Sequence, residues 1–281
     1  MIVLSLATAL PCAIAAQPVR PLPYTMDPRA PIAAKRLQHL TLFDSSYHRA
    51  RDIWIYTPTA YDPRATAPYP LMVAFDGYVY QDTMPLPFIL DTLAATHNAP
   101  AFVGVLIDDG GGPERIADLG NAARMSDFLG KQLVPYVRAH WHVTTDPHRV
   151  IVTGSSAGGL GSAFVAFKRP DLFSNVLSQS GAFWRGAEAS NDAPYEWLTA
   201  QFAASPKKDI RFYMDVGELE SRGALGGAAP SILNANRKLR DALKAKGYSV
   251  TYAEVPAGQH APQYWMKALP TGIVALTQNW R

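Results

Sequence analysis

A serine between two glycines is the clearest candidate nucleophile in the chain. Residues 150–159 read VIVTGSSAGG, so a short apolar strand is expected to run into a G-x-S-x-G turn and then a helix. Ser156 is the central serine of this turn, where side chains at Gly154 and Gly158 would collide. The following helix directs its free N–H groups, beginning with that of Ala157, at a reacting carbonyl oxygen. The pattern predicts nucleophilic chemistry at Ser156; a glycine-rich turn without chemistry is the alternative.

One histidine is placed to act as the base for this serine. Six of the seven histidines precede Ser156, and only His260 follows it. It ends the segment PAGQH, directly after the last predicted strand, where a loop can carry it to the nucleophile. Enzymes with this serine turn place nucleophile, acid and histidine in that order along the chain. Position and order therefore favour a general base over a solvated surface histidine.

Three carboxylates compete for the role of the acid that orients the histidine. They lie in the stretch RFYMDVGELE at residues 211–220. Asp215 lies within the predicted strand and is expected to be structural. Glu218 and Glu220 lie just beyond it, and either can accept the hydrogen of the His260 ring nitrogen that faces away from the serine. Spacing alone leaves both open.

An oxyanion hole needs a second N–H beside that of Ala157. Residues 71–78 read LMVAFDGY, so a tight turn at Asp-Gly would offer the N–H of Tyr78. An ordinary turn at the end of a strand is the alternative.

No metal or cofactor is expected. His140 and His142 lie two residues apart, but no cysteine or third ligand accompanies them, and such a pair is more typical of a helix end. The stretch DDGGG at residues 108–112 lacks the Gly-Lys-Ser of a phosphate loop.

Short apolar strands alternate with helical patterns along the chain. Runs such as FVGVLI and VIVTG are typical of strands buried on both faces of a parallel sheet. Amphipathic patterns predict helices at Ala122–Arg138 and Ser231–Lys246. The first two strands are joined by a short link and should pair antiparallel, whereas the remainder predicts an α/β fold with a mostly parallel sheet of about eight strands and helices on both faces. The predicted strands are His39–Phe43, Asp52–Tyr56, Leu71–Phe75, Phe102–Ile107, Val150–Thr153, Val176–Ser178, Ile210–Val216 and Val250–Val255.

Composition excludes several classes of protein. The 281 residues are 48% hydrophobic and 17% charged, which indicates a globular chain rather than a disordered one. The net charge is only +3, and no cluster of Lys and Arg interleaved with aromatics appears, so no nucleic-acid partner is expected. No apolar run is long enough to span a membrane. Since no Pro/Gly/Ser linker divides the chain, residues 36–281 are predicted to form a single domain.

The N-terminal residues resemble an export signal. Residues 1–16, MIVLSLATALPCAIAA, carry no charge and end in small side chains that suit signal peptidase. They are predicted to be a signal peptide, with residues 17–35 as an extended lead-in; a buried N-terminal helix is the alternative. The only cysteine, Cys12, would leave with the signal, and the protein is expected in the periplasm or outside the cell.

Taken together, these segments resemble a known family. The chain is similar to the esterases that include enterochelin esterases and feruloyl esterases, over most of its length from about residue 40. The combination is far more specific than the serine turn alone. The matching stretches are YPLMVAFDGYVY, FLGKQLVPYVRAHWHVTTDPHRVIVTGSSAGGLGSAFVAFKRPDLFSNVLSQSGAFW, RFYMDVGELE and ILNANRKLRDALKAKGYSVTYAEVPAGQHAPQYW.

The resemblance implies an α/β-hydrolase fold with Ser156 as nucleophile and His260 as base. The spacing in the family favours Glu220 over Glu218 as the acid. The residue after Asp-Gly supplies an oxyanion N–H in relatives, which supports Tyr78.

Two departures from the family pattern alter the rim of the pocket. Gly-Gly-His-Asp is GQHA at residues 258–261 here, and Trp-Trp is Trp184-Arg185. The Arg-x-x-Glu-Leu pattern of enterochelin-like members appears as RIADL at residues 115–119. Arg115 is therefore expected either to bind an anionic or catechol-bearing substrate or to anchor its loop. Trp184 is expected either to line an aromatic-friendly pocket or to pack in the core.

The leading hypothesis is a serine carboxylic ester hydrolase that acts through an acyl-enzyme on a small-molecule ester, a siderophore ester of the enterochelin type. The alternatives are a feruloyl or acetyl esterase on polysaccharide, an acyltransferase with the same acyl-enzyme, and a catalytically silent binding protein on this fold.

Overall fold

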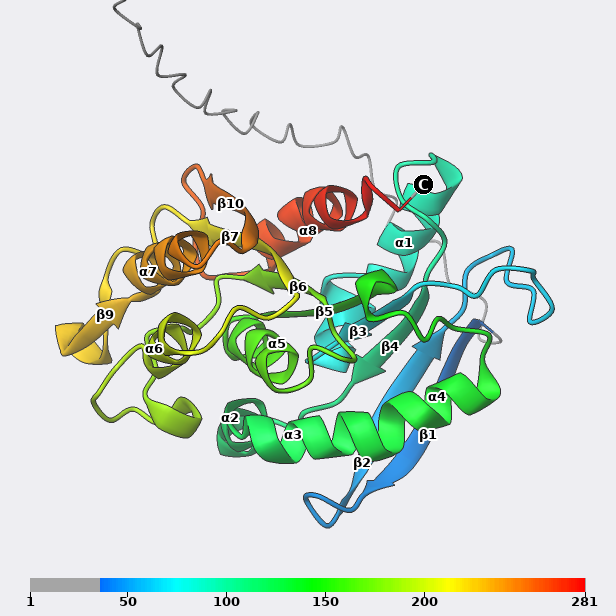
Figure 1. The fold of residues 1–281 in the computed structure, drawn as a ribbon, viewed down its shortest axis with the longest axis horizontal. Helices are drawn as coiled ribbons and strands as arrows, with labels where there is room; N and C mark the ends of the chain where they lie inside the picture. Colours follow the sequence, from blue (N-terminus) through cyan, green and yellow to red (C-terminus); the bar gives the residue numbers. More distant parts are fainter. Residues whose placement is uncertain (1–35, 281) are drawn as a thin grey trace, which may run out of the picture.

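The computed structural model describes residues 36–280, which are built around one large sheet (Figure 1). β1 pairs antiparallel with β2 and β2 with β4, and all other neighbours in the sheet are parallel. The predicted mostly parallel sheet of eight strands is thus confirmed. In spatial order the strands are β1 (Leu37–Asp44), β2 (Arg49–Tyr56), β4 (Val103–Ile107), β3 (Leu71–Ala74), β5 (Val150–Ser155), β6 (Asn175–Gln179), β7 (Arg211–Gly217) and β10 (Ser249–Val255).

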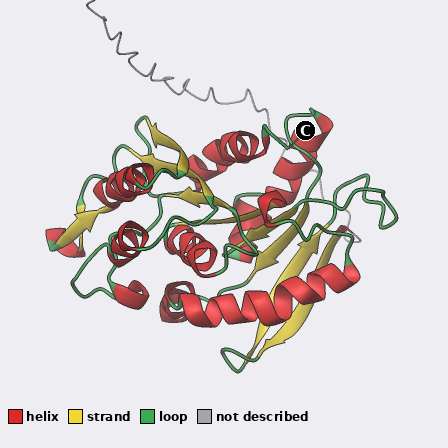
Figure 2. Ribbon diagram, in the orientation of Figure 1, coloured by secondary structure: helices red, strands yellow, loops and turns green. Residues whose placement is uncertain are grey.

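Helices cover both faces of this sheet (Figure 2). One face carries α1 (Leu86–Ala95) and α8 (Pro262–Thr277). The opposite face carries α3 (Ala122–Phe128), α4 (Val134–His140), α5 (Ala157–Lys168), α6 (Trp197–Ala204) and α7 (Ile232–Ala245), with α2 (Gly112–Gly120) packed against α5.

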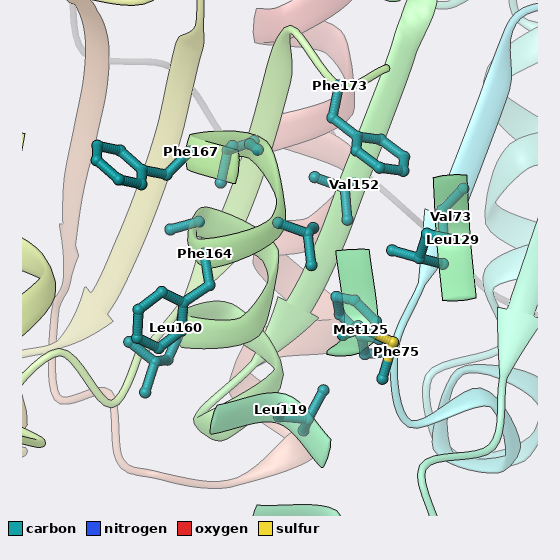
Figure 3. Packing of buried hydrophobic residues seen from close by; sticks show 14 of the residues in the cluster. Val73, Phe75, Leu119, Met125, Leu129, Val152, Leu160, Phe164, Phe167 and Phe173 are labelled. Carbon is teal, nitrogen blue, oxygen red and sulfur yellow. The ribbon is translucent and has the colours of Figure 1, made fainter. Parts of the chain in front are cut away.

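The alternation of side chains along the strands divides the core into two layers. In β3, Leu71 and Val73 face the layer of α5, whereas Met72 and Ala74 face α1 and α8. Figure 3 shows the α5 layer, where Leu160 and Phe164 project from the helix and the side chains of neighbouring strands pack nearby. Because both faces of the central strands are covered, their sequences are apolar at nearly every position.

The long helix predicted before β5 contains an irregular turn. α3 and α4 are joined by a π-helical segment, Leu129–Leu133, so the helical stretch extends to His140. Pro135 has no N–H to donate and lies just beyond this segment, which favours a local widening of the helix. Gly130 lies against the guanidinium of Arg169, where a Cβ would have no room.

Sequence patterns did not predict the small elements between the main ones. The loop after β7 contains a short hairpin of β8 (Gly223–Ala224) and β9 (Ala229–Ser231), and a π-helical turn, Val79–Thr83, follows β3. These segments are too short to show a periodic pattern. α7 begins as predicted, because the Ser231 hydroxyl accepts a hydrogen bond from the N–H of Asn234.

The predicted signal peptide at residues 1–16 and the lead-in at residues 17–35 lie outside the described residues. Within residues 36–280, none of the helices combines the length and apolar character that crossing a bilayer requires.

Candidate active site

Ser156 lies where β5 turns into α5, and the turn is strained. Its φ of +58° and ψ of −118° are rarely adopted by residues with a side chain. A Cβ on Gly154 would lie 2.5 Å from the backbone carbon of Gly158, so the turn closes only with glycine there, as the sequence predicted. The N–H of Ser156 donates to Gln179 O at 2.9 Å, and Ser156 O accepts from the N–H of Ala182 at 2.9 Å. The neighbouring β6 segment thus holds the turn.

A chain of hydrogen bonds joins Ser156 to a histidine and a carboxylate. Ser156 Oγ lies 2.9 Å from His260 Nε2, and His260 Nδ1 lies 2.6 Å from Glu220 Oε2. A carboxylate accepts, so the imidazole carries its hydrogen on Nδ1 and presents Nε2 as the acceptor for the serine hydroxyl. Glu220 is buried, whereas the His260 side chain is 37% exposed, so the histidine faces a site open to solvent.

Two glycines bring the histidine and the carboxylate together. A Cβ on Gly217, at the end of β7, would lie 2.3 Å from Gly258 O in the loop after β10. The same two loops share backbone hydrogen bonds from Glu218 N to Val255 O and from Leu219 N to Gly258 O. The loops therefore lie backbone to backbone, which leaves Glu220 and His260 side by side.

The other two carboxylates of this stretch lie elsewhere. Glu218 Oε2 accepts a hydrogen bond from the N–H of Ala257 at 3.3 Å, on the exposed side of the loop. Asp215 is buried within β7, where its Oδ2 accepts from Gln179 Nε2 at 3.1 Å. Burial raises the pKa of the Asp215 carboxyl to about 8, so this acid is largely neutral at neutral pH.

The two predicted oxyanion donors lie on neighbouring turns. In the described part of the chain, neither the N–H of Tyr78 nor that of Ala157 has a hydrogen-bond acceptor. The turn after β3 lies against the start of α5, because a Cβ on Gly158 would meet Asp76 Oδ2 at 2.9 Å. The turn that carries the N–H of Tyr78 thus lies next to the start of α5, which carries the N–H of Ala157.

Arg115 holds this turn through its aspartate. The guanidinium of Arg115 binds both carboxylate oxygens of Asp76, from Nε to Oδ1 and from Nη2 to Oδ2, the latter at 2.7 Å. Nη2 also donates to Ser155 O at 3.3 Å. The N–H of Asp76 donates to Asp109 Oδ2 at 2.7 Å, and burial together with Asp76 raises the pKa of the Asp109 carboxyl well above its usual range. Of the two roles expected for Arg115, this placement favours anchoring.

Trp184 is 7% exposed and belongs to the core beneath the site, with Tyr195 beside it. Its ring supports the guanidinium of Arg185, whose carbon lies 4.7 Å from the ring centroid. Arg185 donates to Ala189 O and to Asn191 Oδ1. Trp184 thus packs in the core, and the positive charge at this position belongs to Arg185, the next residue in the chain.

Two residues behind the site were not predicted from the sequence to contact the acid. Ser180 Oγ lies 2.6 Å from Glu220 Oε1, and Trp265 Nε1 lies 2.9 Å from Ser180 Oγ. Sequence patterns assigned neither residue a role beside the acid. The Ser-Gly that follows β6 was the available signal, since residues just after a parallel strand lie at the edge where the site forms.

A shallow pocket of about 340 Å³ opens beside His260. Most of its exposed surface is apolar, although four of its seven lining residues are polar or charged; one of these, Arg222, has no carboxylate partner among residues 36–280. The lining residues are Leu219, Glu220, Arg222, Ala224, Ile232, Gln259 and His260.

No group of three or more potential metal ligands occurs within residues 36–280. His140 packs on Tyr136 at the end of α4, with Nδ1 2.8 Å from Tyr136 O, and the N–H of His142 donates a hydrogen bond to Tyr61 Oη. The two histidines lie at the end of α4, and not beside Ser156.

The serine turn, the carboxylate and the histidine follow one another along the chain and meet at the carboxyl edge of a mostly parallel sheet, which is how α/β-hydrolases are built. A family model described as "Putative esterase" matches residues 45–276. The chain belongs to this esterase family, and both the α/β-hydrolase fold and the family resemblance are confirmed.

Curated relatives match most of this chain but only part of their own. The chain is 28% identical to the iron(III) enterobactin esterase of Dickeya dadantii over 86% of this chain and 55% of that protein. It is 28% identical to the iron(III) enterobactin esterase of Escherichia coli K12, over 82% and 54%. The chain thus spans about half the length of these relatives.

Solved structures show the same relationship. The enterobactin esterase of Shigella flexneri, crystallised with enterobactin, superposes with a TM-score of 0.75 at 25% identity, over 87% of this chain and 60% of that chain. A ferulic acid esterase of Anaeromyces mucronatus shares the fold at 17% identity, with a TM-score of 0.65 over 86% and 89%.

Proposed function

We propose that the protein is a serine carboxylic ester hydrolase that acts through an acyl-enzyme. The observation that carries the proposal is the continuous hydrogen-bonded chain from Ser156 through His260 to Glu220, beside two free N–H groups. Membership of an esterase family supports the same reaction.

The first half-reaction acylates the serine. His260 Nε2 takes the proton of the Ser156 hydroxyl as Oγ attacks the ester carbonyl carbon. The carbonyl oxygen becomes an oxyanion, which the N–H groups of Tyr78 and Ala157 stabilise. The C–O bond to the alcohol then breaks, and the imidazolium gives its proton to the leaving alkoxide oxygen. An acyl ester on Ser156 and a free alcohol result.

The second half-reaction returns the free enzyme. His260 takes a proton from water, whose oxygen attacks the acyl carbon, and the same oxyanion site stabilises the second tetrahedral intermediate. Collapse releases the carboxylic acid and returns the proton to Ser156 Oγ. Glu220 stays ionised throughout, holding the Nδ1–H tautomer and stabilising the imidazolium in both steps.

For the substrate we propose a siderophore ester of the enterochelin type. Two arginines at the site, Arg185 and Arg222, have no carboxylate partner within the described residues, so the site can receive an anionic ligand. The apolar lining beside His260 suits an aromatic or otherwise bulky body. The named activity of the enterobactin esterase relatives supports the same choice.

A labelling experiment followed by a substrate panel tests the proposal. A fluorophosphonate probe is expected to label the wild type at Ser156 and to leave Ser156→Ala unlabelled; an unlabelled wild type would indicate a silent binding protein. Among p-nitrophenyl acyl esters, methyl ferulate and ferric tricatecholate lactones, we expect the lactones to give the highest kcat/KM. A preference for methyl ferulate would favour the feruloyl esterase alternative, and products of transfer to an added alcohol would indicate an acyltransferase.

We also propose that the protein is exported to the periplasm or beyond, on the apolar, uncharged character of residues 1–16. Intact mass of protein isolated from its native host is expected to show a chain beginning near residue 16 or 17. A mature chain that retains Cys12 would contradict export by this signal.

A further inference from the structure

A serine and a tryptophan stand directly behind the proposed acid. Ser180 follows β6, is 1% exposed and has a φ of +47°. Trp265, in the first turn of α8, is 8% exposed. Their contacts join the end of β6, the loop after β7 and the start of α8 at one point, and that point is the carboxylate of Glu220.

The chemistry of the groups fixes the direction of these hydrogen bonds. An indole N–H can only donate, so Trp265 Nε1 uses a lone pair of Ser180 Oγ. The serine hydroxyl has one hydrogen, and Glu220 Oε1 lies 2.6 Å from Oγ as an acceptor. The bonds therefore run from Trp265 to Ser180 to Glu220.

Both oxygens of the carboxylate are then committed. Oε1 accepts from the Ser180 hydroxyl and, at 2.8 Å, from the N–H of Gly217. Oε2 accepts from His260 Nδ1 at 2.6 Å. Ser180 and Gly217 are neutral donors, so they fix the position of Glu220 without cancelling the negative charge that the imidazolium needs.

Trp265 also contacts the histidine itself. The two rings pack edge to face, with centroids 5.0 Å apart and planes at 87°. The backbone of Trp265 is held in turn, because its carbonyl oxygen accepts from Gln179 Nε2 at 2.8 Å. One side chain thus limits the orientation of His260 directly and that of Glu220 through Ser180.

We propose that Ser180 and Trp265 are positioning residues of the active site, which hold Glu220 so that only its Oε2 meets His260. The inference rests on the proposed function, since it gives Glu220 the role of the triad acid. It predicts that the hydroxyl of Ser180 contributes to turnover only through that carboxylate.

A double-mutant cycle measures this dependence. Ser180→Ala is expected to lower kcat on p-nitrophenyl acetate by about 10- to 100-fold, as loss of a hydrogen bond to a charged group does, with KM nearly unchanged. In a Glu220→Gln background the same substitution should cost less than about twofold. Trp265→Phe keeps an aromatic ring and removes the donor, so its loss should be smaller and also confined to the wild-type background.

Ser178→Ala is the matched control. Ser178 is a buried serine in β6, two residues before Ser180, and its Oγ has no hydrogen-bond partner within the described part of the chain. Its removal should leave kcat within about twofold of the wild type. Thermal unfolding checks that each variant is folded; if Ser180→Ala fails to fold, the cycle with Trp265→Phe takes its place.

Two results would overturn the inference. An equal loss in the wild-type and Glu220→Gln backgrounds would show a general structural role, and a loss no larger than that of Ser178→Ala would show no role. Ser156→Ala, measured alongside, separates this failure from that of the proposed function. If Ser156→Ala keeps its turnover, the proposed function is wrong; if it is inactive while the cycle is additive, only the positioning role is wrong.

Discussion

Two buried polar clusters lie on opposite sides of β5, and they hold their carboxylates differently. On the β6 and β7 side is the catalytic cluster, in which neutral donors and a histidine surround a single carboxylate. On the β3 and β4 side is the arginine cluster, in which guanidinium groups bind several aspartates. The catalytic cluster consists of Glu220, His260, Ser180 and Trp265, and the arginine cluster of Arg51, Arg115, Asp44, Asp76, Asp109 and Asp118.

The difference follows from what each carboxylate does. An arginine on Glu220 would neutralise the charge that stabilises the imidazolium, so neutral donors suit the role proposed for this carboxylate. The arginine cluster instead fixes backbone: Arg51 ties β2 to Asp44 and Asp118, and Arg115 ties the turn after β3 to the end of β5. The ion pairs of the arginine cluster hold backbone segments in place. The neutral donors around Glu220 hold that carboxylate without cancelling its negative charge.

The largest effect should come from substitution of Ser156, the proposed nucleophile, which lies beside both clusters. Ser156→Ala is expected to lower kcat for ester hydrolysis by about a million-fold if the triad acts as a unit, because no other group can form the acyl-enzyme. Steady-state kinetics on an activated ester, with labelling by a fluorophosphonate probe, provides the measurement. A variant with most of its turnover would mean that the nucleophile is misassigned.

The next effect tests which carboxylate belongs to the catalytic cluster. Glu220→Gln should lower kcat by about ten-thousand-fold, because the amide no longer selects the Nδ1–H tautomer of His260. Glu218→Gln is the matched control, since within residues 36–280 the Glu218 carboxylate accepts a hydrogen bond only from the N–H of Ala257, and should change kcat by a few-fold at most. The measurement is kcat of both variants on one ester. A larger loss of kcat in Glu218→Gln than in Glu220→Gln would reverse the assignment.

A substitution in the arginine cluster should lower the free energy of unfolding. Arg51 is 2% exposed and binds Asp44 and Asp118 at 2.7 Å. Arg51→Met leaves Asp44 buried without its cation and Asp118 paired with Arg49 alone, and should lower the free energy of unfolding by about 3–5 kcal/mol. Denaturant titration measures the loss. Arg64→Met, which removes an arginine that is 92% exposed and 3.9 Å from Asp62, should cost less than about 1 kcal/mol; equal losses would contradict the comparison.

A pH dependence of stability is expected from the buried acid beneath the catalytic cluster. The Asp215 carboxyl has its pKa raised to about 8 from an ordinary 3.8 by burial. Between these values the unfolded chain binds fewer protons than the folded chain, so the free energy of unfolding falls as pH rises, by at most about 1.4 kcal/mol per pH unit. The stabilisation is fully present below the lower pKa and lost above the higher one.

Asp215→Asn removes this titration and can still accept from Gln179. We expect its free energy of unfolding to change less than that of the wild type between pH 5 and pH 8 in denaturant titrations. Asp62→Asn, at an exposed position, should follow the wild type. Parallel curves for the wild type and Asp215→Asn would show that Asp215 is ionised at neutral pH.

Much of the fold and of the candidate site follows from local sequence. Continuous apolar runs identified central strands such as β3, β4 and β5, because burial on both faces demands apolar residues at nearly every position. The serine turn was predictable since its strained geometry requires a glycine at 154, where a Cβ would collide with the backbone of Gly158 four residues on, a local steric condition. His260 was identifiable because it alone among the histidines follows the serine.

Contacts between distant segments were decided only by the tertiary structure. Local spacing left Glu218 and Glu220 equivalent; the backbone contact between Gly217 and Gly258 leaves only Glu220 against the histidine. Arg115 and Asp76 lie 39 residues apart, and Ser180 and Glu220 lie 40 apart. Sequence patterns record the conformation that each segment prefers, because sterics act between neighbours, but which side chains meet depends on how the loops of separate strands pack at one edge of the sheet.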